Sequence, residues 1–275
     1  MRKLLLPMVI VITVWLTGTI ASAAYTVEFF HVQHRKFEDG REFNRAGFGV
    51  FEDSNYITTD KVISVELYHP DGSEVTLTGE GFGPYKVLRG EYKADKNDPN
   101  EGQWNFASEF VTESYYHLNF DEPLQVGNYR LEVTLQGETS PHVLFKHFNG
   151  QESLPIISSN SFHGYADSSG NWIMTWDAPH DTAFWTSGLA TSVRAFVTII
   201  DKGQYVGELD IRQPTHLGIA IAPSNVVQKL EAEGDTFRVQ LQLRTNDDNN
   251  RTYSNSIFTD ELQKEKRKVV VIPLF

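Results

Sequence analysis

The sequence predicts an all-β protein made of two tandem antiparallel β-sandwich domains. Segments rich in Val, Ile, Tyr, Phe and Thr alternate between apolar and polar residues along the whole mature chain. Clusters of Gly, Pro, Asp and Asn separate these segments, and helical periodicity is nearly absent. Short strands at this spacing are typical of sandwiches.

The first 23 residues have the pattern of a secretory signal peptide. Met1-Arg2-Lys3 precedes an apolar run, and Ala21-Ser22-Ala23 supplies the small side chains of a cleavage site before Ala24. The alternative is an uncleaved membrane anchor, but Pro7 interrupts the run and the small-residue site follows it directly. We therefore expect an exported protein, periplasmic, cell-surface or secreted, with no transmembrane segment after cleavage.

Charge and cysteine content exclude several classes of function. Removal of the signal peptide leaves 252 residues and changes the formal charge from −12 to −14, since Arg2 and Lys3 are lost. Nucleic-acid binding is disfavoured because phosphate contacts need clustered Lys and Arg. The chain contains no Cys, so disulfides, thiolate nucleophiles and cysteine metal sites are excluded.

The first predicted domain spans residues 24–148. A hairpin is expected where Pro70-Asp71-Gly72 turns the strand 63–69 back through 74–77, since Pro sets φ and Gly accepts a positive φ. The Gly127-Asn128-Tyr129 stretch resembles the start of the sixth strand of an immunoglobulin-like domain, and 129, 131, 133 and 135 should share one face. The expected strands are Tyr25–Gln33, Glu42–Phe51, Val62–Tyr68, Glu74–Thr78, Tyr85–Tyr92, Trp104–Phe110, Tyr115–Phe120, Tyr129–Leu135 and Val143–Phe148.

A polar linker, 149–155, precedes the second predicted domain, 156–262. Its Gly and Pro residues and its lack of apolar periodicity favour a domain boundary. The strands expected after it are 171–176, 193–200, 204–213, 218–222, a long segment from 230 to 243, and 253–258.

The order of features over residues 152–262 resembles a fibronectin type III domain. In that family a Trp shortly before a Pro anchors the core, as Trp176 and Pro179 do here. A Leu, Gly, Thr and aromatic run then leads into the sixth strand, and it is matched by Leu230, Gly234, Thr236 and Phe237. The family usually has a corner tyrosine where Phe237 stands, so its hydroxyl bond to the backbone is expected to be missing. Such sandwiches serve as spacers, adhesion modules and ligand-binding units.

The candidate binding residues lie in the loop 180–188, between the second and third strands of the resemblance. Trp185, with Phe184 and Asp181 beside it, offers a flat ring that could stack on a sugar or anchor a protein partner. The alternative is that both rings fold back onto the core.

No metal ligand, catalytic residue or cofactor is assigned. His31 and His34 should point to opposite faces of a strand, which rules out a metal pair. The acidic loop 95–101 contains calcium-binding residue types, but Pro99 and Asn100 break the EF-hand pattern, and a solvated hairpin tip explains it better. The same applies to 246–250. No Gly-x-Ser-x-Gly elbow is present.

The C-terminal tail, 263–275, ends in the apolar β-forming run 269–275. Such a segment should not remain free in water. It could dock as an extra strand on an edge of this chain, or 269–275 could mediate self-association by adding a strand to a partner.

These features favour an exported, non-enzymatic structural or protein-binding protein. The first alternative is a carbohydrate-binding accessory protein that uses Trp185. The second is a hydrolase with a site between the domains, which would be indicated by a cleft of convergent polar groups with shifted pKa values.

Overall fold

The computed structural model describes residues 25–52, 55–56, 61–93, 102–151, 153–178, 190–214, 216–245 and 249–258. This part of the chain is mostly β, with one short α-helix. It contains no helix long and apolar enough to span a bilayer. The predicted signal peptide 1–23, the acidic loop 95–101 and the tail 263–275, with its self-association run 269–275, lie outside the described residues.

Most of the predicted strands are present, with shifted ends. Four elements were not predicted or were assigned differently: the two-residue strand β3, the short strand β10, the 3-10 turn η2 and the helix α2. The elements are β1 Tyr25–Phe37, β2 Glu42–Glu52, β3 Asn55–Tyr56, β4 Val62–Tyr68, β5 Gly79–Tyr92, β6 Trp104–Phe106, β7 Val111–Phe120, β8 Gly127–Leu135, β9 His142–Phe148, η2 Ser159–Ser161, β10 His163–Ala166, β11 Trp172–Thr175, β12 Ala190–Asp201, β13 Gln204–Gln213, β14 Ile219–Ala222, α2 Ser224–Glu233, β15 Thr236–Thr245 and β16 Asn250–Phe258.

The predicted turn at 70–72 is confirmed, but the strand expected after it is not. Gly72 has φ +88°, and its N–H donates to the His69 carbonyl at 3.0 Å. The segment 74–78 makes only an isolated bridge, between Tyr68 and Glu74, instead of a strand. The chain continues instead into β5, which pairs with β7 and β13 in a different sheet.

Helix α2 replaces the beginning of the long strand predicted from 230 to 243. Its apolar residues Val226, Val227 and Leu230 are buried on one face, at the spacing of a helix. The helix ends before Gly234, whose N–H donates to the Leu230 carbonyl, and β15 begins two residues later at Thr236. A helix of ten residues gives only a weak periodic signal in the sequence when a long β-forming segment follows it.

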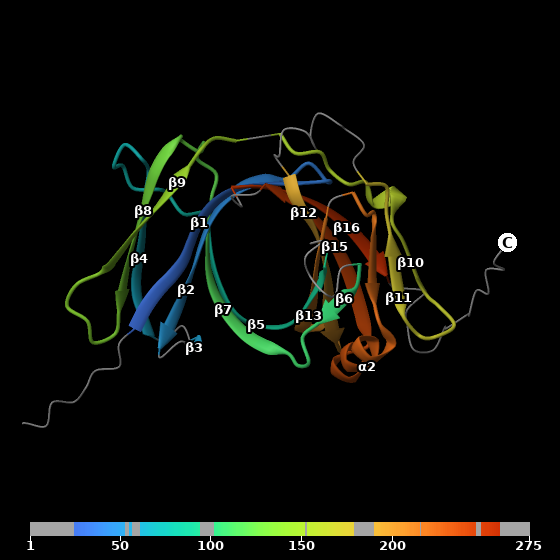
Figure 1. Ribbon diagram of the computed structural model, residues 1–275. Helices are drawn as coiled ribbons and strands as arrows, with labels where there is room; N and C mark the ends of the chain where they lie inside the picture. The colour runs from blue at the N-terminus through green and yellow to red at the C-terminus, as the bar shows by residue number, and fades with distance from the viewer. Residues whose placement is uncertain are drawn as a thin grey trace, which may run out of the picture.

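The prediction of two separate tandem sandwiches is replaced by one large sheet to which both halves of the chain contribute. In the described part of the chain this mixed sheet has ten strands, in the order β1-β16-β15-β12-β13-β5-β7-β2-β3, with β6 added beside β5. Strands β1 and β2 also pair with each other, so eight of the strands close into a ring (Figure 1). Two parallel pairings, β1 with β16 and β13 with β5, join the halves.

A small three-stranded sheet covers each side of the ring (Figure 1). Sheet β4-β8-β9 packs on the first half, where Tyr129, Leu131, Val133 and Leu135 share one buried face as predicted. Sheet β10-β11-β14 and α2 pack on the second half, whose core includes Trp172, Met174 and Trp176. The apolar faces of the ring strands are thus buried outward, and their polar faces are turned toward the inside of the ring.

Candidate functional site

The inside of the ring contains a cavity of about 590 Å³. Side chains from all eight ring strands line it. They are Phe29, Arg35, Arg45, Tyr85, Val87, Arg89, Glu113, Tyr115, His117, Arg194, Phe196, Thr198, Glu208, Asp210, Arg212, Gln240, Gln242, Arg244, Arg251 and Tyr253.

Strand alternation places these side chains. Along β12, residues 193, 195, 197 and 199 are buried in the core beneath sheet β10-β11-β14, while Arg194, Phe196 and Thr198 line the cavity. Strand β15 repeats the pattern, with 237, 239, 241 and 243 in the core and 240, 242 and 244 at the cavity.

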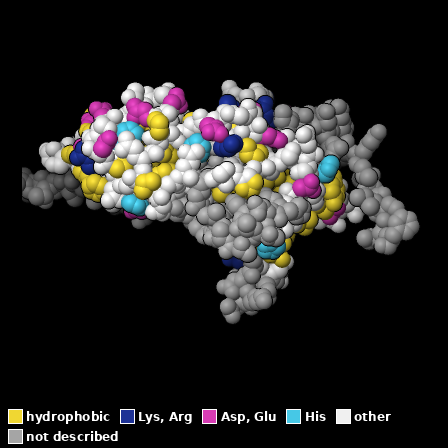
Figure 2. Space-filling view, turned by 90° about the horizontal axis from the view of Figure 1, so that it is seen from above, with side chains coloured by type: hydrophobic (Ala, Val, Ile, Leu, Met, Phe, Trp, Pro, Cys, Tyr) yellow, Lys and Arg dark blue, Asp and Glu magenta, His cyan; other side chains and the backbone are white. Residues whose placement is uncertain are grey.

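The cavity is rich in arginine. Of the 12 arginines in the chain, seven line it, together with three carboxylates and, among the described lining residues, no lysine. The cavity thus has a formal excess of four positive charges, inside a chain whose net charge is −12. On the outer face in Figure 2, by contrast, the coloured Asp and Glu side chains are dispersed.

One group of arginines is held by buried carboxylates. Asp210, whose side chain is 1 % exposed, accepts from Arg89 Nη1 at 2.9 Å and from Arg194 Nε at 2.8 Å, and Arg194 Nη2 contacts its second oxygen. Arg89 Nε also donates to Glu113 Oε1 at 2.9 Å. These charge-assisted bonds compensate the buried charges on this side of the cavity.

Glu208 lies in the same part of the cavity and titrates near neutrality. Burial raises the pKa of this carboxyl from its usual 4.5 to about 7, although Arg194 and Arg89 act in the opposite direction. A carboxyl with such a pKa can give or take a proton at neutral pH.

A second group of arginines lies on β1, β2 and β16. Arg35 is directly opposite Arg251 in the parallel pairing of β1 with β16. Its guanidinium lies 4.8 Å from the centre of the Tyr253 ring, and its buried Nε has no hydrogen-bond partner. Arg45 Nε donates to Asn119 Oδ1 at 2.7 Å. Burial lowers the pKa of Arg35 to about 9, and the charges of Arg45 and Arg251 add to this effect.

Two neutral histidines lie beside this second group. Burial, followed by the charges of nearby arginines, lowers the pKa of His31 to about 3 and that of His117 to about 2. The His31 ring packs against Gly47, where a Cβ would approach it to 2.5 Å. His117 Nδ1 is buried without a hydrogen-bond partner, and its ring lies 5.7 Å from that of Tyr85.

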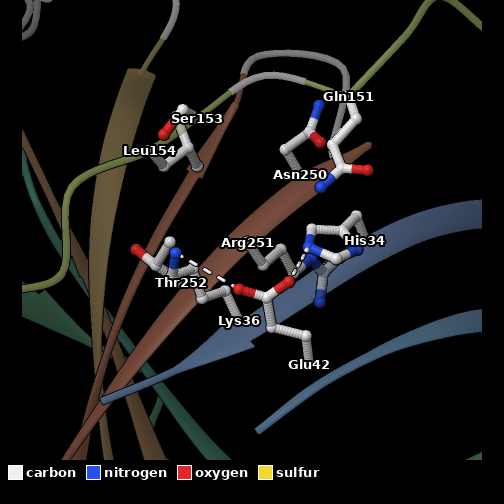
Figure 3. A pocket seen from close by; sticks show the side chains of 9 residues that line it. All are labelled: His34, Lys36, Glu42, Gln151, Ser153, Leu154, Asn250, Arg251 and Thr252. Carbon is white, nitrogen blue, oxygen red and sulfur yellow. Dashed lines mark ion pairs between the residues drawn. The ribbon is translucent and has the colours of Figure 1, made fainter. Parts of the chain in front are cut away.

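His34 lies in a different place from His31, as the strand spacing predicted. It borders a separate pocket of about 330 Å³ at the β1–β16 seam (Figure 3). There Glu42 pairs with Lys36 at 3.2 Å and with His34 at 3.7 Å, and His34 Nδ1 bonds Asn44 Oδ1 at 3.0 Å. Glu42 offsets the charge of Lys36 there, and the pocket is smaller than the cavity, so it is a weaker candidate.

The predicted binding residues Trp185, Phe184 and Asp181, like Pro179, lie outside the described residues. Trp104, the first residue of an expected strand, packs against the second core and contacts the Tyr92 ring edge-on at 5.0 Å. The cavity was not predicted from the sequence. Its only signal was the alternation of Arg, Glu, Asp and Gln with apolar residues in strands 194–212 and 240–244, which is also the pattern of a solvent-exposed face.

Within the described ranges, no group of three or more His, Asp or Glu side chains is arranged to hold a metal ion. No protein-family model matches the chain, and no curated protein matches its sequence.

Proposed function

We propose that this protein binds an acidic organic ligand inside the closed sheet. The observation that supports this most directly is the arginine-rich lining of the cavity, with more cations than carboxylates. Arginine presents a planar fork of donors that matches carboxylate, phosphate and sulfate oxygens. Burying an excess of positive charge destabilises a fold unless an anion offsets it.

The size and aromatic content of the cavity narrow the range of ligands that it could hold. A volume of about 590 Å³ is within the range of sites for small organic molecules. Tyr85, Tyr115, Phe196 and Tyr253 supply ring faces among the cations, and such faces stack on sugars and other flat groups. An acidic saccharide fits both properties, so the proposal develops the carbohydrate-binding alternative with a different set of residues.

Calorimetric titration of the full chain with glucuronate, glucose 6-phosphate and glucose tests the proposal. We expect at least one acidic sugar to bind and glucose not to bind. Thr198 lines the cavity without charge, so Thr198→Trp should fill the space and abolish binding, while Thr198→Val, the matched control, should retain it. Binding that persists unchanged in Thr198→Trp would place the ligand elsewhere and refute the proposal.

Glu208 supports a hydrolase as the second candidate. With a pKa of about 7, it could donate a proton to the leaving oxygen while water attacks the substrate. The test is release of nitrophenolate from 4-nitrophenyl β-glucuronide and 4-nitrophenyl phosphate. Release by the wild type that is lost in Glu208→Gln supports the candidate, and release no greater than that of Thr198→Trp refutes it.

We also propose that each half derives from an immunoglobulin-like or fibronectin type III-like sandwich. In the first half the Gln125 N–H donates to the Tyr129 hydroxyl at 2.9 Å, the kind of bond made by the corner tyrosine of such domains. In the second half Phe237 has no hydroxyl and packs edge-on against Trp172 at 4.7 Å. A role in binding a protein partner stays a proposal for the outer surfaces and the loops.

A further inference from the structure

We propose that Arg35, Arg45 and Arg251 form a subsite for a tetrahedral oxyanion, the phosphate or sulfate ester group of the ligand. This inference rests on the proposed function, because it places the acidic group within the cavity. The three arginines belong to neighbouring strands of the ring, β1, β2 and β16, and all three line the cavity.

The strand pairings bring like charges together. Arg35 is directly opposite Arg251 across β1 and β16. Arg45 is opposite Gln33, two positions from Arg35 along β1, so Arg35 and Arg45 are diagonal neighbours on one face of the sheet. Like charges at directly opposite positions of a sheet repel each other and destabilise it, so an anion bound beside them would relieve this repulsion.

The carboxylate compensation seen around Asp210 does not extend to Arg35 and Arg45. Among the described residues, the groups with the largest effects on the pKa of Arg35 and Arg45 are other arginines and the hydroxyls of Tyr253 and Tyr85, and none is a carboxylate. The buried Nε of Arg35 has no hydrogen-bond partner. Buried donors are almost always paired, and the side chain that carries this one lines a cavity that an anion could enter.

Neutral donors complete the subsite. The Tyr253 hydroxyl accepts from Gln242 Nε2 at 2.5 Å, which leaves its own proton to donate. His117 is uncharged, and its buried Nδ1 is unpaired. A neutral imidazole carries one N–H, which can donate a hydrogen bond to an anion.

The number of donors favours a tetrahedral group over a carboxylate. The guanidinium groups of Arg35 and Arg45, a hydroxyl and an imidazole offer more donors than the two oxygens of a carboxylate can accept, whereas a phosphate or sulfate ester has three terminal oxygens. Glucose 6-phosphate, glucose 6-sulfate and glucuronate carry these groups on similar sugars, so comparing them isolates the chemistry of the acidic group.

The experiment measures the affinity of the full chain for the three sugars, and its melting temperature with and without each, for the wild type and two variants. Arg35→Gln removes one member of the subsite. Arg130→Gln is the matched control, because Arg130 pairs with Glu132 at 2.8 Å on β8, away from the cavity.

We expect either ester to bind the wild type roughly tenfold or more tightly than glucuronate, and Arg35→Gln to weaken ester binding by roughly 10- to 100-fold. The ester that binds more tightly shows whether the natural ligand carries a phosphate or a sulfate group. Without ligand, Arg35→Gln should melt at a higher temperature than the wild type, because a repulsive charge is gone, whereas loss of a merely structural arginine would lower it. Arg130→Gln should leave ester binding unchanged.

Three results would overturn the inference. Glucuronate binding as tight as that of the esters would mean that the cavity takes carboxylates, and the proposed function would survive alone. Ester binding unaffected by Arg35→Gln would place the acidic group elsewhere in the cavity. If no acidic sugar binds the wild type, the proposed function fails together with the subsite.

Discussion

Acid should weaken this fold through two histidines that cannot be protonated where they lie. The pKa of His31 is about 3 and that of His117 about 2 in the folded chain, against about 6.5 in an unfolded one. As the pH falls through 6.5, the unfolded state takes up protons that the folded state does not, so stability falls. Between pH 7 and pH 5 each histidine should lower the free energy of unfolding by about 2 kcal/mol.

Glu208 works in the opposite direction. Its pKa is about 7 in the folded state against an ordinary 4.5, so the folded chain takes up this proton first and gains stability as the pH falls. Over the same interval this gain is about 2 kcal/mol. Between pH 7 and pH 5 the free energy of unfolding of the wild type should therefore fall by about 2 kcal/mol in total. That of Glu208→Gln should fall by about 4 kcal/mol, because the opposing effect of Glu208 is gone. That of the double variant His31→Gln/His117→Gln should rise by about 2 kcal/mol.

Urea unfolding at pH 7 and pH 5, followed by tryptophan fluorescence, measures these differences, since Trp172 and Trp176 lie in the core of the second half. Buffers with a cationic buffering species are needed at both pH values, since anions that bind the cavity would themselves stabilise the folded state. The reasoning is refuted if the double histidine variant loses as much stability at pH 5 as the wild type, because the acid sensitivity would then come from other groups.

Three further predictions concern stability and are each checked by urea unfolding and thermal melting at pH 7. Asp210→Asn should cost about 3–5 kcal/mol, because it removes the negative charge that compensates the buried Arg194; a loss under 1 kcal/mol would show that Arg194 finds another partner. Tyr129→Phe should cost about 1–2 kcal/mol through the lost bond to Gln125, and an unchanged melting temperature would contradict this. Gly127→Ala should cost about 1–3 kcal/mol, since Gly127 has φ +136° and its added Cβ would lie 2.7 Å from Pro70; a neutral result would mean that the turn relaxes.

The strands could be predicted from the sequence because each carries its own alternating pattern. Residues 193–200 show this, since Val193, Ala195, Val197 and Ile199 are buried in the core and alternate with residues that line the cavity. The return strand 74–78 and the helix α2 could not be predicted, because a few residues next to a turn carry too little periodicity to decide between strand, coil and helix.

The closure of the sheet and the cavity within it could not be predicted from local sequence patterns. The pairings of β1 with β16 and β5 with β13 join residues far apart in the sequence, and no periodicity specifies which distant strands become neighbours. Alternation shows that Arg194 and Asp210 lie on the polar face of their strands. It does not show whether that face meets bulk water or an enclosed space, which is why the arginines did not stand out as candidates.

The β1–β16 seam has a consequence for how the chain folds. Strand β1 pairs with β2, which follows it directly, but its other neighbour, Asn250–Phe258, lies far along the chain and is synthesised much later. This raises the contact order and favours slow folding, and it leaves one edge of β1 open until β16 arrives. At high concentration that edge can accept the β16 of a second copy, so refolding should yield domain-swapped dimers in proportion to protein concentration.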